Sequence, residues 1–252
     1  MAGTNALEIE GLAKSYGQQP AVRTISLDVP AGSFFGLVGP NGAGKTTTLA
    51  MCTGLLRPDI GQARIFGHDT WREPVLAKSL MGVLPDGLTL IDRLTGAELL
   101  RYQGLLRGME PRVIDERTTE LLAVLGLDDA RDKLVADFSA GMTKKIGLAA
   151  AMLHAPRLLV LDEPFEAVDP VSSATIRRIL QRYVAGGGTV ILSSHVMATV
   201  EQLCSHVAIM AHGSIAARGP IEEVRGSESL EDVFVRLVGG RSDDEGELQW
   251  LR

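Results

Sequence analysis

One run of small residues has the composition of a phosphate-binding loop. Residues 39–46 read GPNGAGKT and fit the pattern G-x-x-x-x-G-K-[ST]. Its glycines let backbone N–H groups turn toward a phosphate, and a following helix adds partial positive charge there. Lys45 can reach the β- and γ-phosphates, and the Thr46 hydroxyl can ligate Mg²⁺. The predicted nucleotide-binding residues here are Gly39, Pro40, Asn41, Gly42, Ala43, Gly44, Lys45, Thr46 and Thr47.

Two carboxylates follow a short apolar run later in the chain. Residues 158–161 read LLVL, which is typical of a strand buried on both faces of a parallel sheet, and Asp162 and Glu163 come directly after it. Ligands bind at the carboxyl ends of such strands. One carboxylate there can hold Mg²⁺, and its neighbour can deprotonate an attacking water. We therefore expect Asp162 to be a metal ligand and Glu163 to be a general base.

The elements that must position these residues differ along the chain. The first third is β-rich, with a buried strand predicted at 34–38 just before the loop and a helix from Lys45 to Thr53 after it. Residues from about 88 to 154 are mostly helical, with a capping box at 95–98 and an N-cap at Ser139. Strands and helices then alternate again, which predicts a doubly wound sheet. The sequence thus predicts an α/β core that carries an inserted helical lobe.

Charge, apolar runs and cysteine content exclude several classes of protein. The chain has 252 residues with a net charge of −6, so we expect no broad basic surface and no nucleic-acid partner beyond a nucleotide. It contains no apolar run long enough to span a membrane and no secretory signal pattern at its start. Its two cysteines, Cys52 and Cys204, are expected to be packed thiols, consistent with a reducing compartment.

With these residues in order, nearly the whole chain resembles the ATP-binding subunits of ABC transporters. The resemblance implies that 39–46 is the Walker A loop and that 158–163 is Walker B, which ends on the catalytic Glu163. The other matching motifs are an adenine-stacking aromatic at Tyr16, the signature FSAGM at 138–142, a D-loop aspartate at Asp169 and a switch histidine at His195. On its own, His195 would more often be structural, but within this order of motifs we expect it to be catalytic, together with Glu163 and Lys45.

The resemblance also implies a mechanism and partners. Two such domains close head to tail over two ATP molecules, with Mg²⁺ as cofactor, and each ATP lies between one Walker A loop and the other domain's signature helix. Ser139, Gly141 and Asp169 would then contact the nucleotide across the dimer. The implied partners are a separate transmembrane permease subunit and either a second copy or a homologous ATPase subunit, at the cytoplasmic face of the cell membrane. Residues 229–234 resemble the endings of drug, lipid or polysaccharide exporters, which favours export.

Two positions depart from the family's pattern. Ala140 stands where the family usually has the first glycine of the signature, and if that position needs a positive φ, Ala would cost about 1 kcal/mol. Asp86 stands where the family commonly has the Q-loop glutamine. Asp86 could contact Mg²⁺ through water, or it could be an ordinary residue of a surface turn.

The expected fold class is α/β, a P-loop NTPase (RecA-like) core with an N-terminal antiparallel β subdomain and an inserted α-helical subdomain. The predicted limits are 5–240 for the ATP-binding domain (core 5–87 and 155–225, helical subdomain 88–154) and 241–252 for a short acidic tail. Two other functions stay open. One is a soluble ABC-type ATPase of translation or repair, and the other is a nucleotide-dependent regulator without turnover, for which Ala140 and Asp86 are the motive.

Overall fold

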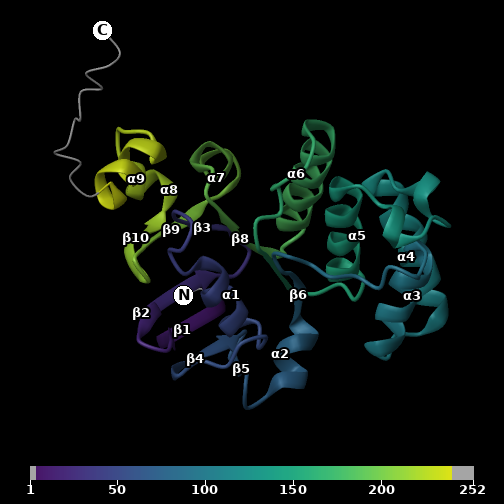
Figure 1. The fold of residues 1–252 in the computed structure, drawn as a ribbon, viewed down its shortest axis with the longest axis horizontal. Helices are drawn as coiled ribbons and strands as arrows, with labels where there is room; N and C mark the ends of the chain where they lie inside the picture. Colours follow the sequence, from purple (N-terminus) through teal and green to yellow (C-terminus); the bar gives the residue numbers. More distant parts are fainter. Residues whose placement is uncertain (1–3, 240–252) are drawn as a thin grey trace, which may run out of the picture.

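Two β-sheets of different kinds meet beside the phosphate loop. The computed structural model describes residues 4–239 of the chain (Figure 1). The first sheet is antiparallel, in the order β2-β1-β4-β5. Its strands are β1 (Asn5–Tyr16), β2 (Gln19–Pro30), β4 (Ile60–Ile65) and β5 (His68–Asp69). One face of β1 and β2 is buried, which accounts for the alternating pattern of apolar and polar residues in both strands.

The second sheet is almost wholly parallel and has the order β10-β9-β3-β8-β7-β6. Its strands are β3 (Phe34–Val38), β6 (Met81–Leu84), β7 (Leu158–Leu161), β8 (Thr189–Ser194), β9 (His206–Ala211) and β10 (Ser214–Pro220). Only β10 pairs antiparallel to its neighbour, through a hairpin that turns at residues 212–213. Since β3, β6, β7 and β8 all run the same way, their carboxyl ends lie at one edge of the sheet.

Both faces of the parallel sheet are buried. On β3, Phe34 and Val38 belong to a core shared with the helices, whereas Phe35 and Leu37 belong to a core shared with the antiparallel sheet and α1 (Lys45–Cys52). Strand β7 is divided in the same way. This two-sided burial explains why these strands read as continuous apolar runs in the sequence.

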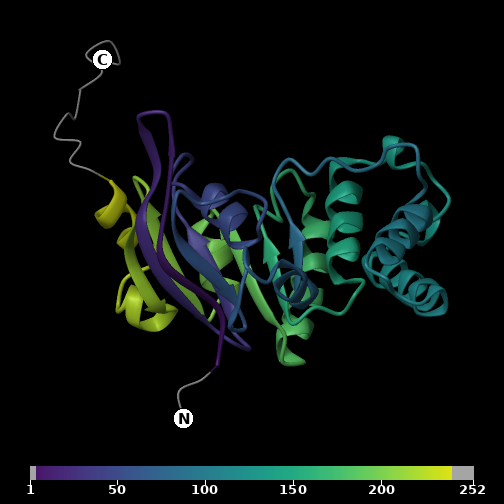
Figure 2. The ribbon, with the colours of Figure 1, turned by 90° about the horizontal axis from the view of Figure 1, so that it is seen from below.

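The helical insertion lies to one side of the sheets. Figure 1 and Figure 2 both place α3, α4 and α5 at one end of the molecule and α9 at the other. Helix α6 packs between the insertion and the sheet, since it contacts α4, α5 and β8. The helices after α1 are α2 (Pro74–Leu80), α3 (Gly96–Leu106), α4 (Pro111–Leu125), α5 (Ala140–Met152), α6 (Pro170–Ala185), α7 (Met197–Leu203), α8 (Ile221–Arg225) and α9 (Leu230–Val238).

Local signals in the sequence account for the ends of several helices. Thr95 and Glu98 form the predicted capping box of α3, and Ser139 caps α5 by accepting a hydrogen bond from the Met142 N–H. Gly126 ends α4 in a left-handed conformation. The α/β fold class, with its antiparallel sheet and helical insertion, is confirmed.

The condition for backbone strain at Ala140 is not met. Ala140 does not adopt a positive φ, because it is the first residue of α5 and takes a helical conformation. Alanine has the highest helix propensity of all residues, so at this position its backbone is unstrained.

Some predictions lie beyond what the structure describes. Residue 240 and the acidic tail 241–252 are outside the described residues, and the division into 5–87, 88–154 and 155–225 stays a prediction. Within residues 4–239, none of the helices has both the length and the apolar character needed to cross a membrane.

Candidate nucleotide site

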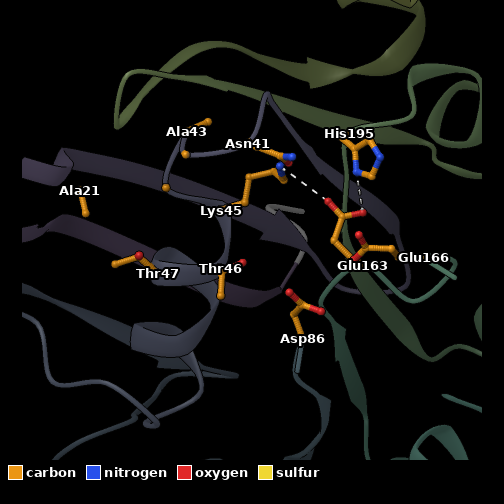
Figure 3. Close-up of a pocket in the computed structure, with 12 residues that line it drawn as sticks. Ala21, Asn41, Ala43, Lys45, Thr46, Thr47, Asp86, Glu163, Glu166 and His195 are labelled. Carbon is orange, nitrogen blue, oxygen red and sulfur yellow. Dashed lines mark hydrogen bonds and ion pairs between the residues drawn. The ribbon is translucent and has the colours of Figure 1, made fainter. Parts of the chain in front are cut away.

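The ends of four parallel strands converge on one pocket. Strand β3 leads into the phosphate loop, β6 into Asp86, β7 into Asp162 and Glu163, and β8 into His195. Because β8 lies between β3 and β7 in the sheet, the strand ends that carry the loop, His195 and the carboxylates are neighbours. The pocket, of about 440 Å³, is lined by Ala21, Asn41, Gly42, Ala43, Gly44, Lys45, Thr46, Thr47, Asp86, Glu163, Glu166 and His195 (Figure 3).

The phosphate loop wraps tightly around the Lys45 side chain. The Lys45 ammonium donates to the carbonyl oxygens of Gly39 at 2.8 Å and Pro40 at 3.3 Å. Gly44 precedes α1 with φ of 101°, and a Cβ there would come within 2.5 Å of the Ala21 carbonyl oxygen. Only glycine fits that position, so the tight turn that aims the helix N-terminus at the pocket depends on it.

Glu163 is held at both carboxylate oxygens. Its Oε1 lies 3.6 Å from the Lys45 ammonium and its Oε2 lies 3.2 Å from Nδ1 of His195, as the dashed lines in Figure 3 mark. The side chains of Lys45 and Glu163 are 6% and 12% exposed, whereas that of His195 is 44% exposed. The structure therefore brings together the three side chains predicted to be catalytic.

Strand β8 also anchors the Walker B backbone. The Glu163 N–H donates to the Ser193 hydroxyl at 2.9 Å, and that hydroxyl in turn donates to a carboxylate oxygen of buried Asp162. Ser193 thus links the ends of β7 and β8, since it holds the Asp162 carboxylate and the Glu163 backbone. The sequence pattern did not single out this role for Ser193, since it depends on which strands are neighbours.

The polar residues beside the pocket fit a Mg²⁺ ion that is bound partly by the phosphates of a nucleotide. Thr46, Asp86 and Asp162 line one adjoining hollow. Among residues 4–239, no group of three or more His, Cys, Asp or Glu side chains is arranged to hold a metal. Mg²⁺ is commonly bound by one or two carboxylates together with substrate phosphates, so a protein cage is not required.

Asp86 has features of both of its expected roles. It lines the pocket near Glu163 and Glu166 (Figure 3), yet its side chain is 45% exposed and accepts a hydrogen bond from the Gly87 N–H, as a turn residue does. Glu166 and Ala21 also line the pocket, and sequence reasoning missed both. Glu166 lies in the loop after Walker B, three residues before Asp169.

Tyr16 is not brought into the pocket. It lies at the end of β1, is 56% exposed and pairs in register with Gln19. Its ring is therefore accessible from outside, and its predicted stacking on adenine stays a prediction.

The signature and D-loop residues lie together outside this pocket. Ser139 is exposed at the start of α5, while Gly141 is buried against Asp169, with an Asp169 carboxylate oxygen 3.2 Å from where a Cβ would be. Asp169 caps α6 and accepts hydrogen bonds from the N–H groups of Ser172 and Val171. These bonds, led by that from the Ser172 N–H, lower the pKa of the Asp169 carboxyl. The N-terminus of α5 is thus an open, polar surface away from the chain's own Walker A loop.

Comparison with known proteins gives the same family throughout. Residues 22–166, more than half of the chain, match the family described as ABC transporter. The chain is 38% identical over 244 residues to the daunorubicin/doxorubicin resistance ATP-binding protein DrrA of Streptomyces peucetius, covering 97% of this chain and 74% of that protein. It is 37% identical over 223 residues to the bacitracin transport ATP-binding protein BcrA of Enterococcus faecalis, covering 88% and 70%.

Solved structures agree with this assignment. The structure of an ATP-binding subunit of an ABC transporter superimposes with a TM-score of 0.86 at 29% identity, over 92% of this chain and 99% of that one. A dimeric post-hydrolysis form of the ATP-binding cassette MJ0796, bound to ADP and phosphate, has the same fold, with a TM-score of 0.78 at 20% identity over 85% of this chain and 98% of that one. The chain belongs to the ABC transporter family, among its ATP-binding subunits.

Proposed function

We propose that this chain hydrolyses ATP and thereby powers the movement of a substrate through a separate transmembrane subunit. The observation that carries the proposal is the arrangement of Glu163 between Lys45 and His195 at the mouth of the phosphate loop. A carboxylate so placed can accept a proton from water, while an ammonium beside it offsets phosphate charge. Family membership supports the same activity.

Each residue has a distinct role in the proposed reaction. The loop N–H groups and Lys45 bind the β- and γ-phosphates of ATP. Glu163 accepts a proton from the attacking water as the bond to the γ-phosphorus forms and ADP leaves. His195, hydrogen-bonded to Glu163, orients that carboxylate and would contact the γ-phosphate.

Mg²⁺ would be held by Thr46 and Asp162, with Asp86 reaching it through water. When bound, the ion neutralises charge on the β- and γ-phosphate oxygens. The Ser193 hydroxyl, which donates to Asp162, keeps that carboxylate aimed at the same point. The proposal therefore includes that ATP hydrolysis requires Mg²⁺, because these side chains supply the oxygen ligands that the ion prefers.

The working unit is proposed to be a head-to-tail dimer. Ser139 and the first N–H groups of α5 are exposed and carry the positive end of a helix, which suits the γ-phosphate of a nucleotide bound to another domain. Gly141 and Asp169 lie directly beside them. The second domain is either another copy of this chain or a homologous subunit.

Export is the proposed direction of transport. DrrA and the linearmycin resistance protein LnrL of Bacillus subtilis are resistance proteins by name, and a rhizobial relative is called a Nod factor export protein. Their sequences are 36–38% identical to this chain. A subunit of this kind would act at the cytoplasmic face of the cell membrane, bound to its permease.

The test is steady-state ATP hydrolysis by the purified chain, with and without Mg²⁺, beside Glu163→Gln. We expect Mg²⁺-dependent turnover, and a fall in kcat of about 100-fold or more in the variant, because a general base contributes that much to rate. Glu223→Gln, which makes the same charge change on an exposed part of α8, is the control and should keep the wild-type rate.

Turnover that Glu163→Gln leaves intact would contradict the proposed role of this carboxylate. No turnover by the wild-type chain, alone or with its permease, would instead support a nucleotide-dependent regulator. A nucleotide-binding measurement completes the second test, because a regulator without turnover still binds nucleotide.

A further inference from the structure

A lysine from the helical insertion reaches the wall of the nucleotide pocket. Lys144 lies in α5, one turn beyond the signature residues. Its ammonium donates to the backbone carbonyl of Glu163 at 3.0 Å and lies 3.9 Å from Oδ1 of Asp86. The side chain is only 15% exposed. One cation on α5 thus contacts the residues that follow both β6 and β7.

The carbonyl that Lys144 contacts belongs to a backbone in an unfavourable conformation. Glu163 has φ of 45°, which residues with a Cβ rarely adopt, and such conformations persist only where their surroundings hold them. Three hydrogen bonds hold this one. Its N–H donates to Ser193, and its carbonyl accepts from the Glu166 N–H at 3.2 Å and from Lys144. The bond from Lys144 is the one assisted by charge, so it is the strongest of the three.

We propose that Lys144 is a positioning residue for ATP hydrolysis. It holds the strained Glu163 backbone and so keeps the carboxylate between Lys45 and His195. This inference rests on the proposed function, because it needs Glu163 to act as the base. Of its two contacts, the 3.0 Å hydrogen bond to the Glu163 carbonyl is closer than the 3.9 Å ion pair with Asp86, so we assign the effect of Lys144 to Glu163.

The placement of Lys144 on α5 has a further consequence. The same helix carries Ser139 at its N-cap and Lys144 in its second turn. Any displacement of α5 relative to the sheet therefore moves the γ-phosphate receptor and the support of the base together. Contact of Ser139 with a nucleotide and correct placement of Glu163 become linked steps.

The test compares Lys144→Met, which removes the donor and the charge, with Lys144→Arg, which keeps both. For Lys144→Met we expect kcat to fall about tenfold, which corresponds to about 1.4 kcal/mol at the transition state, while the KM for ATP stays unchanged. Lys144→Arg should restore most of kcat. Lys145→Met is the matched control, because Lys145 is the next residue of α5, is similarly part-buried and makes no ion pair within residues 4–239.

A second comparison separates positioning from general damage to the fold. In a Glu163→Gln background, Lys144→Met should not lower the remaining single-turnover rate further, because its effect passes through the missing carboxylate. Thermal unfolding of each variant shows whether it is folded. Should Lys144→Met not fold, Lys144→Gln takes its place in the same comparisons.

Three results would overturn the inference. A folded Lys144→Met variant with wild-type kcat would refute it and leave the proposed function standing. Equal losses in Lys144→Met and Lys144→Arg, or a full additive loss in the Glu163→Gln background, would show that Lys144 only stabilises the fold. Absence of any turnover in the wild-type chain, with its permease present, would remove the proposed function and this inference together.

Discussion

Glu163 is the residue on which the site depends. Its two carboxylate oxygens contact Lys45 and His195, and its backbone is fixed by Ser193 and Lys144. Side chains from β8, α1 and α5 therefore meet at one residue of the β7 loop. A carboxylate held this firmly needs little rearrangement when it accepts a proton, which is how a fixed polar site lowers a reaction barrier.

His195 should affect the chemical step more than nucleotide binding. Its Nδ1 lies 3.2 Å from Glu163, and its ring is the most exposed of the three central side chains. We predict that His195→Ala lowers kcat about 100-fold while changing the KM for ATP little, as measured by steady-state hydrolysis. A variant that loses affinity for ATP but keeps kcat would show that His195 binds the nucleotide instead.

Ala167 is strained by its backbone. It lies in the loop after Walker B with φ of 56°, where a Cβ is unfavourable. We predict that Ala167→Gly raises the free energy of unfolding by about 0.5–1 kcal/mol, since relief of strain exceeds the added entropy of the unfolded chain. Urea denaturation measures this change.

The matched control for Ala167→Gly is the same substitution in a helix. Ala174 is exposed within α6, so Ala174→Gly should lower the free energy of unfolding by about 1 kcal/mol. If both substitutions shift stability in the same direction, the left-handed conformation at Ala167 is not a source of strain.

At the scale of elements, a hydrogen bond from His154 connects the end of α5 to the parallel sheet. His154 follows α5, and its Nε2 lies 3.0 Å from the Met81 carbonyl oxygen at the start of β6. Burial, together with the nearby Arg107 and Arg117, lowers the pKa of His154 to about 4. The ring is therefore neutral at pH 7 in the folded chain.

This shift makes stability depend on pH. Between the unfolded pKa of 6.5 and about 4, the unfolded chain binds more protons at His154 than the folded chain does. Its contribution to stability is complete above pH 6.5 and is lost as the pH falls toward 4. Because the ring is partly exposed, the slope should be less than about 1.4 kcal/mol per pH unit.

His154→Gln isolates this contribution, because other titrating groups cancel in the difference from the wild type. We predict that the difference in the free energy of unfolding between the two chains changes between pH 7.5 and pH 5, with the wild type losing more stability. Urea unfolding at several pH values measures it. A difference that is constant with pH would mean that His154 titrates normally in the folded chain.

The strands nearest the site could be predicted from the sequence. Some of the helices farther from it could not. Strands β3 and β7 were predicted because both faces are buried and no polar residue interrupts them. Helix α2 was missed, since it is short and only Ala77 among its residues is buried. The resemblance of residues 229–234 to exporter endings did not predict that Leu230 and Val233 of α9 pack into the core.

The residues of the site that belong to sequence motifs could be predicted from the sequence. Lys45 and Glu163 were named from their own motifs and His195 from the family resemblance, and the sheet order then brings them together. The contacts of Lys144 and Ser193 with Glu163 could not be predicted in this way. They depend on how α5 and β8 pack against β7, and nothing in the local sequence specifies that packing.

At the scale of the whole molecule, the chain has two separate surfaces that we propose to face nucleotide. The Walker A pocket lies at the edge of the parallel sheet, and the signature residues Ser139 and Gly141 lie with Asp169 on α5 and α6, outside that pocket. One chain therefore holds two halves of a site that do not meet within it. A head-to-tail pair would complete two sites at once, which is the central claim of the proposed function.

The mass of Glu163→Gln in solution, with and without Mg²⁺ and ATP, tests this claim most directly. The chain has a mass of 26.9 kDa, so light scattering coupled to size-exclusion chromatography separates one copy from two. We predict a monomer without nucleotide, a dimer with ATP, and a monomer again when Ser139→Glu is added, because a negative charge at the start of α5 repels the γ-phosphate. A variant that binds ATP yet stays monomeric, or a dimer that Ser139→Glu leaves intact, would contradict the account.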